Sequence, residues 1–245
     1  MGSESSTTIG SPDFTNETHF PAYTGLPSEY TIDRRYFFPD GSPAGHWCFL
    51  AEIKESVTSL MFTRPLYNVR DRDGVRYLVA YHLEDRARFP LIVEQCKDGY
   101  TMCIMYAHQH LFADGQRGIR VEMESSVKIL PCSLKSLFSI RDKVLKLKNS
   151  GFCNGCGDNA TLKCARCRLF YCTKSCQLAD WNYGEHKNEC KVAQQISEWG
   201  TFDWDSFDEH RLFEIPANLR PGSVAAKTAA VAQAKNDANR IFLRF

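Results

Sequence analysis

The chain has 245 residues, with 30 Lys and Arg against 29 Asp and Glu, and 11 cysteines. This length has room for about two domains, and the formal net charge of +1 lacks the basic excess that nucleic-acid-binding proteins usually carry. No apolar run approaches the roughly 18 residues of a membrane span, and the polar N-terminus lacks the apolar core of a secretory signal. We therefore expect an intracellular protein, cytoplasmic or nuclear, whose thiols stay reduced.

Residues 1–45 predict a disordered tail followed by an extended arm. Residues 1–18 hold eight serines and threonines and few apolar side chains, a composition typical of disorder. Residues 19–45 combine prolines and glycines with several aromatic side chains, so we expect this arm to pack onto the domain that follows. The aromatic residues of the arm are Phe20, Tyr23, Tyr30, Tyr36, Phe37 and Phe38.

Residues 46–148 predict a β-barrel-like domain that ends in a helix. Segments rich in aromatic and β-branched residues favour short antiparallel strands, and the Asp-Gly pairs at residues 73–74 and 114–115 are turn signals. Strands at this spacing are typical of a small barrel, for which the OB type is one candidate. The expected strands cover residues 47–57, 60–70, 75–83, 100–112, 118–122 and 127–131.

Helical periodicity follows the strands. Ser133 is suited to cap a helix that runs to residue 148 and has Leu134, Leu137, Phe138, Arg141 and Leu145 on one face. The fold class predicted for the whole chain is α+β.

A second helix is expected from Cys190 to Trp199, with Val192 and Ile196 on its apolar stripe. Residues 200–245 predict a C-terminal tail, irregular at first and then helical over the alanine-rich residues 224–240.

Seven cysteines and one histidine lie within residues 153–190, in the spacing C-x2-C-x7-C-x2-C-x4-C-x3-C-x9-H-x3-C. Thiolates and imidazole are the donors that zinc prefers, and four of them complete a tetrahedral site. Eight ligands therefore make two sites without an open position for water, which predicts structural rather than catalytic metal. The candidate ligands are Cys153, Cys156, Cys164, Cys167, Cys172, Cys176, His186 and Cys190.

The spacing separates this segment, residues 149–199, from other two-zinc modules. RING and PHD modules also use eight ligands, but their last ligands normally form x2 pairs, whereas the final intervals here are x3, x9 and x3. Simple burial of so many regularly spaced thiols is the weaker explanation. Residues 150–195 hold six basic and four acidic side chains, and seven thiolates around two zinc ions would add three negative charges, so a phosphate-gripping finger is not indicated.

With Tyr171 before the fifth ligand, Trp181, and the pair His186-Lys187, the segment resembles a MYND-type zinc finger. The resemblance covers residues 153–190 and includes all eight ligand positions. It implies two interleaved zinc sites. One holds Cys153, Cys156, Cys172 and Cys176, and the other holds Cys164, Cys167, His186 and Cys190. The four residues between Trp181 and His186 make a longer gap than is usual in the family.

MYND fingers are peptide-binding modules that recognise proline-rich segments of other proteins, so the resemblance implies a non-enzymatic adaptor with two Zn²⁺ ions. Family groove positions fall on Gln177 and Trp181, one helical turn apart, and on the small residue Ala165. Core packing of Trp181 and plain solvation of Gln177 are the competing interpretations. The segment 169–171 is a candidate strand edge for the peptide. Residues 46–131 are similar to the region that flanks the finger in fungal MYND proteins.

Two further functions were weighed against the adaptor. Enzymes of the SET methyltransferase class carry MYND inserts, but the asparagine-histidine-serine-cysteine segment of that class is absent here. An OB-like barrel could bind single-stranded nucleic acid by stacking bases on aromatic rings; core packing is the commoner role for such rings. His108 and His110 could form a metal pair, although a polar strand face is the simpler explanation. The candidate stacking residues are Tyr77, Tyr81, Phe89, Tyr100 and Tyr106.

Overall fold

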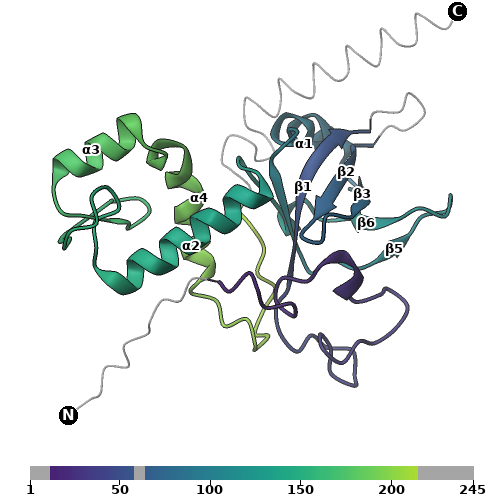
Figure 1. Cartoon of the computed structure of the whole chain (residues 1–245). Coiled ribbons are helices and arrows are strands. Elements are labelled where there is room, and N and C mark those ends of the chain that lie inside the picture. The colour runs from purple at the N-terminus through teal and green to yellow at the C-terminus, as the bar shows by residue number, and fades with distance from the viewer. Residues whose placement is uncertain (1–11, 58–63, 215–245) are drawn as a thin grey trace, which may run out of the picture. The chain divides into compact units, whose positions relative to one another are not determined.

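A computed structural model of the chain describes residues 12–57 and 64–214. The chain divides into two compact units, each built from segments distant in sequence (Figure 1). The sheet unit comprises Asn16–Leu134 and Trp204–Phe245, and the finger unit comprises Met1–Thr15 and Lys135–Asp203. Within the described ranges, no helix is both long and apolar enough to cross a membrane.

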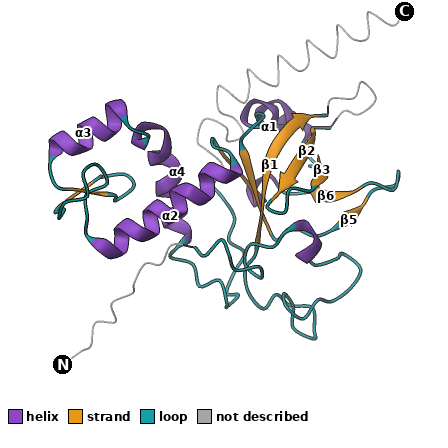
Figure 2. Cartoon of the chain, in the orientation of Figure 1, coloured by secondary structure: helices purple, strands orange, loops and turns teal. Residues whose placement is uncertain are grey.

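A seven-stranded sheet with the order β5-β6-β3-β2-β1-β4-β7 forms the sheet unit. Its strands, orange in Figure 2, are antiparallel neighbours except for β3 and β6, which run parallel. The strands are β1 (Cys48–Ser56), β2 (Leu66–Asp71), β3 (Arg76–Tyr81), β4 (Thr101–Met105), β5 (His110–Leu111), β6 (Arg117–Val121) and β7 (Val127–Leu130).

This topology corrects the expected antiparallel barrel in two respects. The sheet is mixed, because Leu78 to Tyr81 of β3 pair in parallel with Gly118 to Val121 of β6. It is also open, since β5 and β7 form its two edges and do not pair with each other in the described chain. Parallel pairing requires a long crossover connection, and here that crossover contains β4 and β5 as well as a helix.

The crossover helix is α1 (Phe89–Gln95), which the sequence analysis did not predict. Its seven residues include the apolar run Phe89 to Val93, and a run this short does not distinguish a buried helix from a strand. Pro90 stands at the start of the helix, where its missing N–H costs nothing. Phe89 and Ile92 bury their side chains in the core cluster of the sheet.

The strand expected over residues 100–112 is interrupted. β4 ends at Met105, and Tyr106 takes a left-handed backbone conformation with φ of 55° before β5 begins at His110. Left-handed conformations are uncommon outside glycine and end a strand locally. The other expected strands that fall on described residues are confirmed, with β2 starting only at Leu66.

The N-terminal arm packs on the sheet, as expected. Tyr23, Leu26 and Tyr36 belong to the same core cluster as Trp47 and Phe49 of the β1 region. Tyr23 lies in a short 3-10 turn (Tyr23–Gly25), and its hydroxyl donates to the Gly118 carbonyl at 3.2 Å. Two further 3-10 turns cover Arg86–Arg88 and Glu124–Ser126.

The finger unit contains the helices α2 (Leu134–Ser150), α3 (Lys174–Tyr183) and α4 (His186–Trp199), with the short strands β8 (Leu162–Lys163) and β9 (Phe170–Tyr171). Residues 12–15 belong to this unit, which corrects the expectation of a disordered tail up to residue 18. Phe14 is fully buried, edge-on to Phe138 and Trp199, and Arg141 donates to Asp13 at 2.6 Å. Residues 1–11 lie outside the described ranges.

The buried face of α2 differs from the one that periodicity predicted, whereas the buried face of α4 agrees with it. Leu134 and Leu137 of α2 are buried as expected, but Ile140 and Val144 complete the stripe in place of Arg141 and Leu145. The α4 stripe of Val192, Ile196 and Trp199 is confirmed. Residues 200–214 are irregular, and the predicted helix 224–240 lies outside the described residues.

Candidate functional site: two metal centres in the finger

Two turns of the same geometry present the first four thiols. The Gly157 N–H donates to the Cys153 carbonyl at 3.0 Å, and the Arg168 N–H donates to the Cys164 carbonyl at the same distance. The residue after each C-x2-C pair is left-handed, with φ of 85° at Gly157 and 66° at Arg168. Each tight turn therefore brings its two cysteines together, as a C-x2-C metal pair requires.

The other four donors stand at helix beginnings. Thr173 caps α3 by accepting the Cys176 N–H at 3.1 Å, which places Cys172 and Cys176 on either side of the cap. His186 is the first residue of α4, and Cys190 follows one helical turn later on the same face.

The eight donors gather in two groups of four. Cys153, Cys156, Cys172 and Cys176 form site 1, and Cys164, Cys167, His186 and Cys190 form site 2. Within each site all donor atoms lie within 4.8 Å of one another. This is the interleaved arrangement that the resemblance implies: each site takes one turn pair and one helix pair.

The distances between donors fit a zinc tetrahedron. With Zn–S bonds of about 2.3 Å, neighbouring sulfurs would lie about 3.8 Å apart. In site 1, Cys172 Sγ lies 3.4 Å from Cys156 Sγ and 3.5 Å from Cys176 Sγ. In site 2, Cys164 Sγ and Cys190 Sγ are 3.8 Å apart. These separations are far longer than the disulfide bond of about 2.0 Å, so the set suits a shared ion.

Backbone N–H groups favour the thiolate form in both sites. At Cys153, burial raises the pKa, but hydrogen bonds from the N–H groups of Cys156, Cys172 and Gly155 bring it down to about 6. At Cys164, burial likewise raises the pKa, and the N–H groups of Cys167 and Arg166 lower it below its usual value. A thiol must lose its proton to bind metal, and backbone N–H groups favour that loss at one cysteine of each site.

His186 is held in a form suited to a ligand. Burial lowers the pKa of His186 and so favours the neutral imidazole, and Asp180 has a smaller effect in the opposite direction. Its Nε2 lies 3.3 Å from Cys167 Sγ, on the metal side, while its Nδ1 lies 2.6 Å from the Tyr171 hydroxyl. The ring stacks on Tyr171 and meets Trp181 edge-on, with centroids 5.5 Å away in both cases.

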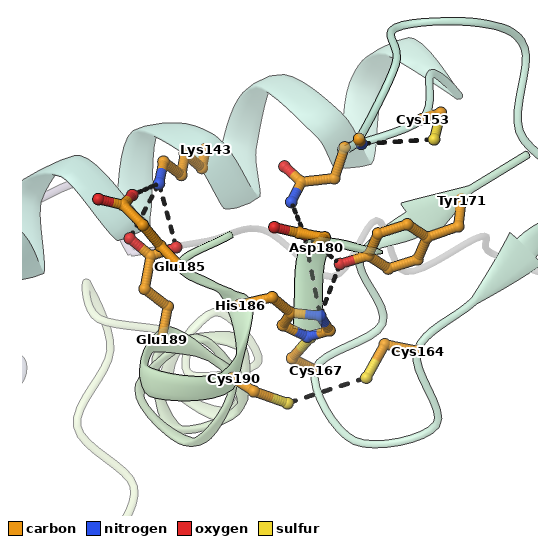
Figure 3. Close-up of polar contacts among 12 residues, drawn as sticks. Lys143, Cys153, Cys164, Cys167, Tyr171, Asp180, Glu185, His186, Glu189 and Cys190 are labelled. Carbon is orange, nitrogen blue, oxygen red and sulfur yellow. Dashed lines mark hydrogen bonds and ion pairs between the residues drawn. The ribbon is translucent and has the colours of Figure 1, made fainter. Parts of the chain in front are cut away.

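Charged side chains link α2 to the start of α4. Lys143 Nζ lies 2.6 Å from Glu185 and 2.9 Å from Glu189 (Figure 3). Glu189 sits between the ligands His186 and Cys190 on the first turn of α4, so the ion pairs position the helix that supplies two donors to site 2.

The three predicted groove residues differ in exposure. Trp181 and Gln177 are half-buried on α3, and Ala165 is exposed directly after Cys164. Trp181 touches site 2 through His186, so it both packs inside and reaches the surface. The segment 169–171 has fewer backbone groups available to a peptide than expected. The Leu169 carbonyl accepts a hydrogen bond from the Cys164 N–H, and the Phe170 carbonyl accepts one from the Asn154 N–H. Among the described strands β8 pairs only with β9, so the outer edge of β8 has no strand beside it.

The residues considered for other functions are mostly structural. Tyr81 and Phe89 are buried in the core cluster, and Tyr77, Tyr100 and Tyr106 pack against it half-buried. Tyr77 already stacks on Tyr23 with centroids 3.8 Å apart. The histidine pair does not gather in a metal cluster among the described residues.

The two histidines instead have separate partners. His108 stacks on Phe37, and His110 pairs with Glu29 at 2.7 Å.

Three of the four cysteines outside the finger lack the features of reactive or ligating thiols. Cys48 and Cys103 are fully buried, and burial raises the pKa of both far above the ordinary value. At Cys96 burial raises the pKa to about 11. Protonated, enclosed thiols are chemically inert.

Sequence reasoning missed the polar residues behind His186. Tyr171 was noted only as a family marker, while Asp180 and Asn154 were not singled out. Each of the three is the direct neighbour of a predicted site residue. Asn154 follows Cys153, Tyr171 precedes Cys172, and Asp180 precedes Trp181. The available signal was that Asn154 and Tyr171 are adjacent to ligands and Asp180 is adjacent to Trp181, but nothing in the spacing shows that the three residues meet.

A family model described as the MYND finger matches residues 153–190. The segment with the two donor clusters is thus a MYND zinc finger, a non-catalytic interaction module. The matched residues do not include the sheet unit. None of the curated proteins matches the chain.

Solved structures similar to the chain were also found. A chain from "Structure and Conformational Change of a Replication Protein A Heterotrimer Bound to ssDNA" has 12% identity and a TM-score of 0.28, over 49% of this chain and 82% of that one. A chain of the S. pombe Stn1-ten1 complex has 12% identity and a TM-score of 0.29, over 48% and 87%. Schizosaccharomyces pombe Pot1pC bound to ssDNA has 9% identity and a TM-score of 0.29, over 44% and 96%. Similarities this low support no inference about fold or function.

Proposed function

We propose that the protein is a non-enzymatic adaptor whose finger holds two structural Zn²⁺ ions and binds short proline-rich segments of other proteins. The observation that carries the proposal is Trp181, which packs edge-on against the site 2 ligand His186 and remains half-exposed. A ring held in this way is a rigid aromatic surface beside a closed metal site. The compartment that we propose for the protein is the cytoplasm or the nucleus, where free thiols persist.

The expected peptide contacts follow from side chains around Trp181. A proline-rich segment adopts an extended conformation with little entropy left to lose, and its rings stack on aromatic side chains. Gln177, one turn before Trp181 on α3, can exchange hydrogen bonds with the peptide backbone. The small side chain of Ala165 leaves space beside site 2. The outer edge of β8, with no strand beside it among the described residues, is the edge proposed for strand addition.

The test is peptide binding by the full chain loaded with zinc. Labelled proline-rich peptides and their Pro→Ala counterparts are compared by fluorescence anisotropy. We expect Trp181→Ala to weaken binding by roughly 30-fold, the loss of about 2 kcal/mol that is typical of a central aromatic contact. Gln177→Ala should have a smaller effect in the same direction.

A matched control is available on the same helix. Tyr183 is 91% exposed and lies two residues beyond Trp181, so it points away from that face. Tyr183→Ala should bind the peptides as the unaltered chain does. Equal binding by Trp181→Ala, or a preference for the Pro→Ala peptides, would exclude the proposed groove.

Single-stranded nucleic-acid binding through the sheet unit is the alternative. The structure gives it little support, because two of its five candidate rings are buried and the other three pack on the core. Retention of the chain on single-stranded DNA or RNA, decreasing steeply with salt, would favour it over the adaptor.

A further inference from the structure

A chain of hydrogen bonds joins the first metal-binding turn to the histidine of the second site. Asn154, directly after Cys153 of site 1, donates its side-chain N–H to Asp180 Oδ2 at 2.6 Å. The Tyr171 hydroxyl lies 2.7 Å from the same oxygen and 2.6 Å from Nδ1 of His186 in site 2. Figure 3 shows Tyr171 and Asp180 converging on the face of His186 opposite the cysteines.

The proton positions along this series of hydrogen bonds follow from Asp180, the one carboxylate in it. An ionised carboxylate only accepts hydrogen bonds, so the Tyr171 hydroxyl donates to Asp180. The hydroxyl oxygen is then free to accept, and Nδ1 of His186 must be the donor. This sets the tautomer with the proton on Nδ1, which leaves the Nε2 lone pair directed toward Cys167 and the metal position.

Two members of this hydrogen-bond chain, Asn154 and Tyr171, are tied to site 1. Asn154 is fixed by its neighbour Cys153 and by its N–H bond to the Phe170 carbonyl at 2.9 Å, and Tyr171 immediately precedes Cys172. A metal ion in site 1 would be held by both Cys153 and Cys172, and would thereby fix their neighbours Asn154 and Tyr171 at the same time. Without that ion both residues, and hence the orientation of His186, would be less constrained.

We propose that Tyr171, Asp180 and Asn154 are positioning residues that orient His186 for metal and make binding at site 2 depend on occupancy of site 1. The inference rests on the two-zinc part of the proposed function and is independent of peptide binding. Hydrogen-bonded partners of histidine ligands commonly contribute about 10- to 100-fold in metal affinity.

The first experiment measures Co²⁺ binding to the metal-free full chain by absorption, with competition by a chelator. Site 1 has four sulfur donors and site 2 has three, so the two sites give separable d–d bands. Tyr171→Phe keeps the ring that stacks on His186 and removes only the hydroxyl. We expect it to weaken site 2 by about 10-fold or more, to shift the site 2 band, and to leave the site 1 band in place.

Two variants complete this experiment. Asp180→Asn should weaken site 2 in the same direction, because an amide is a poorer acceptor than a carboxylate. Tyr183→Phe removes a hydroxyl from an exposed tyrosine of the same helix and should change neither band. The ¹⁵N shifts of the metal-loaded chain should place the His186 proton on Nδ1. A site 2 affinity unchanged in Tyr171→Phe, or a proton on Nε2, would overturn the positioning role.

The second experiment tests the coupling by a double-mutant cycle. Cys156→Ser disables site 1 and should weaken site 2 in the unaltered background. In the Tyr171→Phe background the same substitution should weaken site 2 much less, because the connection is already broken. Equal losses in the two backgrounds would show that Tyr171 does not carry the coupling, and no loss in either background would show that the sites are independent; both results would overturn the proposal. Failure of the unaltered chain to bind two metal ions would contradict the proposed function itself, whatever the variants do.

Discussion

Gly118 shows how one residue can limit the sheet. It lies in β6 opposite Leu78 of β3, at the parallel pairing. A Cβ at Gly118 would lie only 2.0 Å from the Leu78 carbonyl oxygen and 3.0 Å from the Phe112 ring. The two backbones therefore approach more closely than any other residue would allow. The sequence indicated only that a strand starts at Gly118. It could not show the close approach, because Leu78 is forty residues away in the chain.

We expect Gly118→Ala to lower the free energy of unfolding by about 1–3 kcal/mol, since the added methyl group must displace backbone. Urea denaturation followed by intrinsic tryptophan fluorescence, to which the buried Trp47 contributes, measures this loss. Arg120→Ala, an exposed change on the same strand, is the control and should have a minor effect. An unaltered urea midpoint in Gly118→Ala would show that β3 and β6 are farther apart than described.

Among elements, α3 depends on its first turn. It carries Gln177, Asp180 and Trp181, and its Thr173 cap lies between two ligands of site 1. The sequence predicted the eight candidate ligands, which gather in two groups of four, but not this cap. Elsewhere, α1 was missed because a short apolar run fits either a helix or a strand, and the strand over 100–112 was predicted too long because a left-handed Tyr106 has no marker in the sequence.

We expect Thr173→Ala to destabilise α3 by about 1 kcal/mol, the usual value of an N-cap hydrogen bond. Because metal binding and folding of such a finger are one process, the loss should appear as roughly five-fold weaker zinc binding in a chelator competition. Thr173→Ser retains the capping oxygen and should bind nearly as tightly as the unaltered chain. If serine and alanine were equally weak, the methyl group rather than the cap would be the stabilising feature.

For the whole molecule, the two units draw their stability from different sources. The sheet unit has an aromatic core that runs from the N-terminal arm through β1 to β6. The segment 153–190 buries mainly its metal ligands together with Leu169 and Tyr171, which is a small apolar core. Short modules of this kind obtain their folding free energy from metal, about 10 kcal/mol or more for a structural zinc site.

Removal of metal should therefore unfold residues 153–190 and leave the sheet unit folded. Amide hydrogen exchange of the full chain, read peptide by peptide with and without a chelator, measures both parts in one sample. We expect protection to disappear in the finger and to persist in β1–β4. Retained protection across 153–190 after complete chelation would mean that packing, and not metal, holds the finger.

The spacing of seven cysteines and one histidine was enough to predict eight ligands for two metal ions and the MYND resemblance, because ligands paired by turns and single helical turns are local in the chain. The assignment of those ligands to two interleaved sites came from the resemblance. The helical stripe of α4 and most strands were predictable for the same reason. The mixed, open sheet, the close approach at Gly118 and the chain from Asn154 to His186 depend on contacts between residues far apart in sequence. Such contacts arise only when whole elements pack together, and for that reason they became visible only in the folded protein.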